Sequence, residues 1–133
     1  MKDKQISSLG IASEEQIIAV RQKAREIAGK IGFGTVDQTR ITTAVSELAR
    51  NIYHFAGKGI VIIFSLEGDQ KGIKIICQDD GPGIADIKLA MTDGYSTGKS
   101  LGLGLPGTKR LMDEFQIESE SDKGTKITVT KWL

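Results

Sequence analysis

Two stretches in the first half of the chain repeat apolar residues every three or four positions. The first, within residues 13–32, and the second, within residues 35–57, each place these residues on one side of a helix. The two apolar sets are Ile17, Val20, Ala24, Ile27 and Ile31, then Ile41, Val45, Leu48, Ile52 and Phe55. The expected N-terminal capping pairs are Ser13 with Gln16 and Thr35 with Gln38. The pattern therefore predicts two amphipathic helices, which end at Gly32 and Gly57.

The second half of the chain favours strands. Residues 60–66 and 73–79 are short, rich in β-branched residues and separated by a turn-prone segment, so they predict a hairpin. Residues 115–119 and 125–129 alternate about the turn at 122–124 and predict a second hairpin. Between the hairpins, the sequence predicts a short helix at 86–91, a glycine-rich loop at 92–104 and a helix at 105–114.

This order of elements favours an α+β fold. Helices interspersed with antiparallel hairpins are typical of a two-layer sandwich, whereas a doubly wound parallel sheet requires strands and helices in strict alternation. We expect a mixed, mostly antiparallel sheet that is covered on one face by helices. At 133 residues, the chain predicts a single domain over 1–133.

Composition narrows the choice of partner. The formal net charge is +1, so no strong field favours a nucleic acid or an anionic membrane. The single cysteine, Cys77, has no partner for an internal disulfide, and neither a signal peptide nor a membrane span is evident. We expect a soluble cytoplasmic protein with no nucleic-acid and no membrane partner.

One candidate for chemistry is the pair Glu47 and Asn51 in "SELARN". A four-residue step returns almost to the same helix face, so both side chains point in one direction. A carboxylate and an amide oxygen together suit a divalent cation or a positioned water. From spacing alone, an exposed polar helix face is the simpler interpretation.

A second candidate is "DDGPG", in which Asp79 precedes Gly81 and Gly83. A carboxylate at a strand end can accept a hydrogen bond from an exocyclic amine, and nearby glycines let a planar ring approach the backbone. The alternative is a plain turn between a strand and a helix.

The third candidate is Gly102 and Gly104 in "GLGLPG", with Lys99 nearby. Backbone N–H groups at a helix N-terminus favour a bound phosphate. A lone Gly-x-Gly is common, however, and no strand precedes it as a dinucleotide-binding fingerprint requires.

Together the three motifs resemble the N, G1 and G2 boxes of the GHKL ATPases, the family of gyrase, Hsp90, histidine kinases and MutL. The similarity covers about residues 35–132. Longer segments are similar to the RsbT-type serine-protein kinases of bacterial partner-switching pathways. These segments are "RITTAVSELARNIY", "AGKG", "DDGPGI", "GYSTGKSLGLGLPGTKRLMDEF" and the terminal "KWL".

The resemblance implies a Bergerat-type sandwich that binds ATP and Mg²⁺. Asp79 would recognise the adenine amine, and Asn51 would ligate Mg²⁺. Glu47 would assist the attacking hydroxyl. The glycines would act in two places: Gly81 and Gly83 at the base, Gly102 and Gly104 at the phosphates. We add Lys99 as a phosphate-neutralising side chain.

The chain also departs from its relatives. Tyr95 stands where the lid usually has phenylalanine, so the alignment of that loop is open. The only histidine, His54, follows Asn51 and is expected at the surface or in packing, which argues against histidine autophosphorylation.

The resemblance predicts an ATP- and Mg²⁺-dependent serine/threonine protein kinase. Its substrates would be STAS-domain antagonist and scaffold proteins of a stressosome, and after release the kinase would activate a partner phosphatase. The alternative is an anti-sigma factor of the same fold that sequesters a sigma factor.

Overall fold

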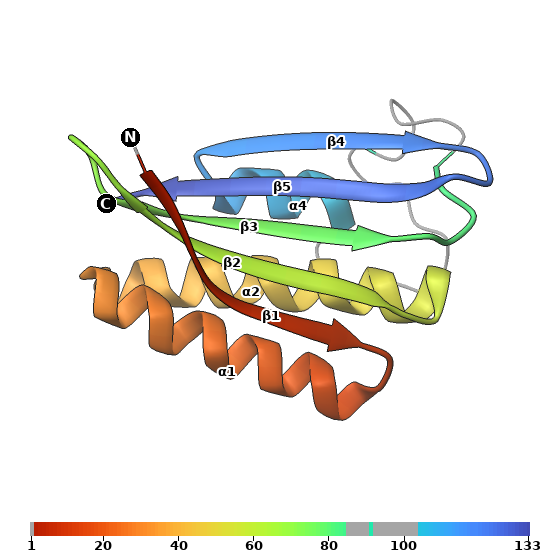
Figure 1. Cartoon of the computed structure of the whole chain (residues 1–133), viewed down its shortest axis with the longest axis horizontal. Coiled ribbons are helices and arrows are strands. Elements are labelled where there is room, and N and C mark those ends of the chain that lie inside the picture. Colours follow the sequence, from red (N-terminus) through yellow and green to blue (C-terminus); the bar gives the residue numbers. More distant parts are fainter. Residues whose placement is uncertain (1, 85–90, 92–103) are drawn as a thin grey trace.

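The computed structural model describes residues 2–84, 91 and 104–133 (Figure 1). The elements are β1 (Lys2–Ile11), α1 (Glu14–Ile31), α2 (Thr35–Asn51), η1 (Ile52–Ala56), β2 (Gly59–Glu67), β3 (Gly72–Asp79), α4 (Gly104–Leu111), β4 (Glu114–Glu120) and β5 (Gly124–Trp132). Residues 86–90 of the short helix predicted at 86–91, and residues 92–103 of the glycine-rich loop predicted at 92–104, lie outside the described residues. None of the described helices has the length and apolar character needed to cross a membrane.

The five strands form one sheet in the order β1-β2-β3-β5-β4, and every neighbouring pair is antiparallel. The three α-helices of the described residues, α1, α2 and α4, lie on one side of this sheet (Figure 1). Alternate residues of the central strands, such as Val61, Ile75 and Val129, are fully buried against them. The predicted α+β sandwich with helices on one face is confirmed.

Strand β1 was not expected from the sequence. It pairs with β2 along its length, with an irregularity in register between Gln5 and Ser7. Its sequence, "KDKQISSLGI", lacks a regular alternation of apolar and polar residues. Because β1 is an edge strand with few buried side chains, the two-residue period that identifies a strand is weak.

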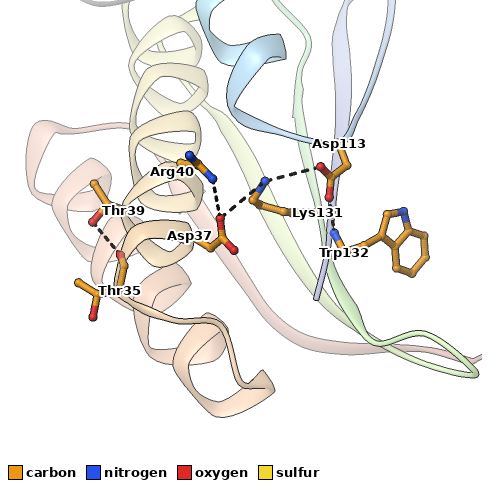
Figure 2. Close-up of polar contacts among 7 residues, drawn as sticks. All are labelled: Thr35, Asp37, Thr39, Arg40, Asp113, Lys131 and Trp132. Carbon is orange, nitrogen blue, oxygen red and sulfur yellow. Dashed lines mark hydrogen bonds and ion pairs between the residues drawn. The ribbon is translucent and has the colours of Figure 1, made fainter.

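The helix starts agree only in part with the expected caps. Ser13 Oγ accepts a hydrogen bond from Gln16 N at 3.3 Å, as a capping residue should. The second capping pair is wrong, because α2 is capped by Gly34 without a side-chain bond. Gln38 Nε2 instead donates to Phe33 O at 2.8 Å, and the Thr35 carbonyl accepts from Thr39 Oγ1 at 3.0 Å (Figure 2).

Two helix ends also differ from the prediction. The long second helix changes at Asn51 from an α-helix to the π-helix η1, which ends at Gly57. The last helix ends at Leu111 rather than at 114. Asp113 N already donates to Thr130 O at 2.9 Å, so this residue is held by β5 and cannot continue the helix.

The start of α2 is held to the sheet through Lys131, which is only 7% exposed. Its Nζ lies 3.6 Å from Asp113 Oδ1 and 4.0 Å from Asp37 Oδ1 (Figure 2). Arg40 Nη1 approaches the same Asp37 oxygen at 3.0 Å. Anchored here, the 17 residues of α2 extend about 25 Å towards the opposite end of the sheet, where β3 ends.

Candidate nucleotide site

Asp79 is the last residue of β3, and it lies opposite Thr125 of β5. Its Oδ1 accepts a hydrogen bond from Gly81 N at 2.8 Å. Burial raises the pKa of the Asp79 carboxyl above its ordinary value, while the N–H groups of Gly81 and Thr125 oppose this and the charge of Asp80 adds to it. A carboxylate has about four lone-pair positions, so Asp79 keeps the capacity to accept from a ligand amine.

Gly81 packs tightly against the π-helix. A Cβ built on Gly81 would lie 2.5 Å from Ala56 Cβ, closer than real Cβ atoms approach, and 3.0 Å from Asp79 Oδ1, which is a tight contact. The absence of a side chain therefore lets the loop lie directly on η1 beside the carboxylate.

Gly83 meets a different part of the molecule. Its φ is +74°, and a Cβ there would lie 1.9 Å from the carbonyl oxygen of Glu120. The next residue, Ile84, donates its N–H to Ser119 Oγ at 2.7 Å. The turn between β4 and β5 thus holds this end of the loop, and the expected role of Gly83 at a base stays a prediction.

On α2, Glu47 is 4% exposed and its Oε1 lies 2.8 Å from Arg50 Nη1. Asn51 is the last residue of the helix and is partly exposed. The motifs predicted Glu47 and Asn51 but missed Arg50. The Glu-x-x-Arg spacing on a helix was the available signal, because residues three apart are neighbours on the helix surface.

The end of α2 lies next to the end of β3. A Cβ built on Gly59 would come within 2.6 Å of Ile52 Cγ2 and 3.1 Å of Asp79 Cβ. Ile52, which directly follows Asn51, and Asp79 therefore both lie against Gly59. Helix α4, which starts at Gly104, packs against α2. The end of β3, the end of α2 and the start of α4 face the same end of the molecule (Figure 1).

A hollow of about 320 Å³ lies beside Asp79. It is lined by Ala56, Lys58, Gly59, Ile60, Gln78, Asp79 and Asp80. Val61 and Cys77 are buried against the helices, and side chains alternate between the two faces of a strand. Their neighbours Ile60 and Gln78, which pair with each other, therefore lie on the sheet face away from the helices. The hollow therefore lies at the rim of the sheet, with Asp79 among its lining residues.

Several expected residues are not part of this convergence. Lys99, Gly102 and Tyr95 lie outside the described residues. His54 is exposed on η1, and its ring centroid lies 5.5 Å from that of Tyr53.

The residues present fit a nucleotide with a magnesium ion better than a metal centre held by protein alone. Among the described residues, no group of three or more His, Cys, Asp or Glu is placed to hold a metal. Magnesium commonly takes one or two protein oxygens and completes its shell with phosphates and water. Asn51 would supply an amide oxygen to the ion, and Asp79 would accept a hydrogen bond from the amine of the base.

Comparison with known proteins decides the family. The family described as the histidine kinase-like ATPase domain matches residues 11–131. The chain belongs to this family of ATPase domains. The match begins at Ile11, the last residue of β1, and ends at Lys131 in β5, so it includes the helices and strands β2 to β5 but little of β1.

Two kinds of protein, a kinase and an anti-sigma factor, are similar to this chain over most of its length. The chain is 56% identical to the serine/threonine-protein kinase RsbT of Bacillus subtilis, and the match covers 96% of each chain. It is 42% identical to the anti-sigma F factor of Clostridium novyi, over 71% of each chain. The resemblance to RsbT-type kinases that the motifs predicted is confirmed.

A solved structure supports the fold. The crystal structure of the RsbU and RsbW domains of Rv1364c from Mycobacterium tuberculosis matches with a TM-score of 0.64 at 20% identity. This match covers 95% of the chain and 32% of that structure.

Proposed function

We propose that this ATPase domain is an ATP- and Mg²⁺-dependent serine/threonine protein kinase. The 56% identity to RsbT along nearly the whole chain supports the kinase class. The observation that carries the mechanism is the convergence on one end of the molecule of Asp79, the Glu47–Asn51 face of α2 and the start of α4. Phosphoryl transfer requires little more than positioning and charge stabilisation, which these groups are suited to provide.

Each residue has a separate task in this proposal. The Asp79 carboxylate accepts a hydrogen bond from the adenine amine, next to the close approach of Gly81 to η1. Asn51 presents its amide oxygen to Mg²⁺, which neutralises phosphate charge when bound. The backbone N–H groups at Gly104 and along the first turn of α4, together with Gly102 and Lys99, bind phosphate oxygens.

Glu47 orients the attacking hydroxyl and accepts its proton. It lies one helical turn before Asn51, so a hydroxyl at this carboxylate would stand beside the metal-bound phosphate. Its burial keeps water from competing for the same position, since the residue is 4% exposed.

The protein substrate is proposed to be a STAS-domain antagonist or scaffold protein of a stressosome. After transfer the kinase would leave its substrate and activate a partner phosphatase. This proposal follows the RsbT-type resemblance, and it places the protein in the cytoplasm with no nucleic-acid or membrane partner.

The test is phosphoryl transfer to a STAS-domain protein with ATP and Mg²⁺. Wild type should label a serine or threonine, and Glu47→Gln should lose most of the transfer while still binding ADP. Absence of transfer by wild type, or full transfer by Glu47→Gln, would overturn the catalytic assignment.

A second candidate is an anti-sigma factor, which the 42% identity to the anti-sigma F factor of Clostridium novyi favours. The two functions differ in the protein that is bound. Mixing the chain with a sigma factor, and separately with a phosphatase of the pathway, and asking which co-elutes would distinguish them.

A further inference from the structure

Glu47 and Arg50 form an ion pair on α2 that is largely enclosed. The Glu47 side chain is 6% exposed and that of Arg50 is 31% exposed, with Nη1 and Oε1 2.8 Å apart. An ionised carboxylate at this depth requires a compensating group, and a guanidinium at hydrogen-bond distance supplies both charge and direction.

The helix geometry places Arg50 on the flank of the proposed reaction site. At 3.6 residues per turn, Arg50 lies about 60° to one side of Glu47 and Asn51 about 40° to the other. The carboxylate therefore stands between the proposed metal ligand and the guanidinium. The contact between Arg50 Nη1 and Glu47 Oε1 fixes the direction of this carboxylate.

We propose that Arg50 is a positioning residue for phosphoryl transfer: it orients the Glu47 carboxylate towards the substrate hydroxyl. This inference rests on the proposed function, because it requires Glu47 to act on the hydroxyl. Arg50 acts through Glu47 and does not itself contact ATP. Its loss should therefore slow transfer without weakening nucleotide binding.

The same helix offers a matched control. Arg40 pairs with Asp37 at the same three-residue spacing, with Nη1 and Oδ1 3.0 Å apart. Both side chains are far more exposed, at 51% and 38%, and they lie at the start of α2. Arg40→Met removes an arginine of the same kind from the same helix, away from the proposed site.

The experiment measures single-turnover transfer to a STAS-domain protein at saturating ATP, with ADP affinity measured in parallel. Arg50→Met should lower the transfer rate roughly 10- to 100-fold, the scale of a small misplacement of a catalytic group. Arg50→Lys should recover part of the rate, and Arg40→Met should match wild type. ADP affinity should stay within about two-fold in all three.

A double-mutant cycle separates positioning from other roles. If Arg50 acts only through Glu47, adding Arg50→Met to Glu47→Gln should cause no further loss of rate. An equal loss in both backgrounds, an unchanged rate in Arg50→Met, or a loss explained by weaker ADP binding would overturn the proposal. Should Arg50→Met not fold, Arg50→Lys and its cycle with Glu47→Gln give the same decision. Absence of transfer by wild type would instead overturn the proposed function, and the role of Arg50 with it.

Discussion

The properties of Asp79 follow from its place at the end of a buried strand. One of its oxygens already accepts from Gly81 N at 2.8 Å, so the carboxylate is held in a fixed orientation before a ligand arrives. A preorganised acceptor spends less entropy on binding. This fixed orientation makes Asp79 the best single residue for testing the proposed adenine site.

Asp79→Asn keeps the size of the side chain and removes its charge. We expect ADP affinity to fall by about 1.5 to 3 kcal/mol, the range for a hydrogen bond to a charged group. Calorimetric titration with ADP and Mg²⁺ measures this, with Asp80→Asn as a neighbouring control. Unchanged affinity in Asp79→Asn would remove this residue from the binding site.

Cys77 offers a test of burial in the adjacent core. Burial raises the pKa of its thiol from 9.0 to about 12, with a smaller contribution from Asp79. The unfolded chain loses this proton near pH 9 while the folded chain keeps it, so folding stability falls as the pH rises above 9. The loss is about 1.4 kcal/mol per pH unit until the folded thiol also ionises.

The measurement is urea unfolding of wild type and Cys77→Ala at pH 8 and pH 10. Wild type should lose about 1.4 kcal/mol more than the variant between these values. The pH difference within each protein cancels the cost of the smaller side chain. The difference between the two proteins then cancels the titration of other groups. Equal losses would mean that the Cys77 thiol is not shielded from water.

At the scale of residues, the sequence pointed to candidate site residues but not to the ion pair between Glu47 and Arg50. Asp79, Glu47 and Asn51 were identified because their types and spacings match a known family. Arg50 was not singled out, because its three-residue spacing from Glu47 allows a contact but does not show that the two side chains meet. Its 2.8 Å contact with Glu47 is a property of side-chain conformation, which a pattern of residue types does not specify.

Among the elements, η1 has the most direct bearing on the site. This five-residue π-helix follows Asn51 without a break and ends against the loop after β3. π-helical turns are rare and are frequent at functional sites. Here the wider turn carries Ala56 to Gly81, and so fixes the loop that follows Asp79.

Gly81→Ala tests this contact. Its Cβ would lie 2.5 Å from Ala56 Cβ, so the loop must move away from η1 and carry Asp79 with it. We expect ADP affinity to fall about ten-fold or more, on the scale of one displaced hydrogen bond to a charged group. Calorimetry at fixed Mg²⁺ measures it.

Two variants sharpen that result. Ala56→Gly in the Gly81→Ala background removes the nearer clash and should restore part of the affinity. Gly10→Ala introduces the same change where a Cβ meets nothing within 4 Å, and it should bind ADP as wild type does. If Gly81→Ala binds normally, the close approach of η1 has no part in the site.

Sequence patterns predicted some of the helices and strands and missed others. Helices α1 and α2 were predicted because their apolar stripes are long and regular. The edge strand β1 was missed because it buries little and so needs no regular alternation. The change to η1 at Asn51 was missed for another reason: the apolar spacing of Ile52 and Phe55 also fits a continued α-helix. Hydrogen-bond register is set by tertiary packing rather than by propensity.

At the scale of the whole molecule, α2 runs from one end of the sandwich to the other. One end presents Glu47 and Asn51 to the proposed site, and the other is held to the sheet through Asp37 and Lys131 (Figure 2). The sandwich itself was predictable from the order of its elements. The link through Lys131 was not, because a lysine in a final strand gives no sign of being buried.

The last prediction concerns what Lys131 contributes to the stability of the sandwich. Its side chain is 9% exposed, whereas its partners Asp37 and Asp113 are 38% and 43% exposed. Removing the charge therefore leaves no carboxylate buried and unpaired: Asp37 keeps Arg40, and Asp113 still accepts from Trp132 N at 2.7 Å. The packing of the aliphatic stem should matter more than the ion pairs.

Lys131→Met keeps the stem and should change the free energy of unfolding by less than about 1 kcal/mol. Lys131→Ala removes three buried methylene groups and should cost about 2 kcal/mol. Urea unfolding of the three proteins at low and high salt measures both effects. If Lys131→Met is as unstable as Lys131→Ala, and salt narrows its gap to wild type, the ion pairs and not the stem hold the start of α2 to the sheet.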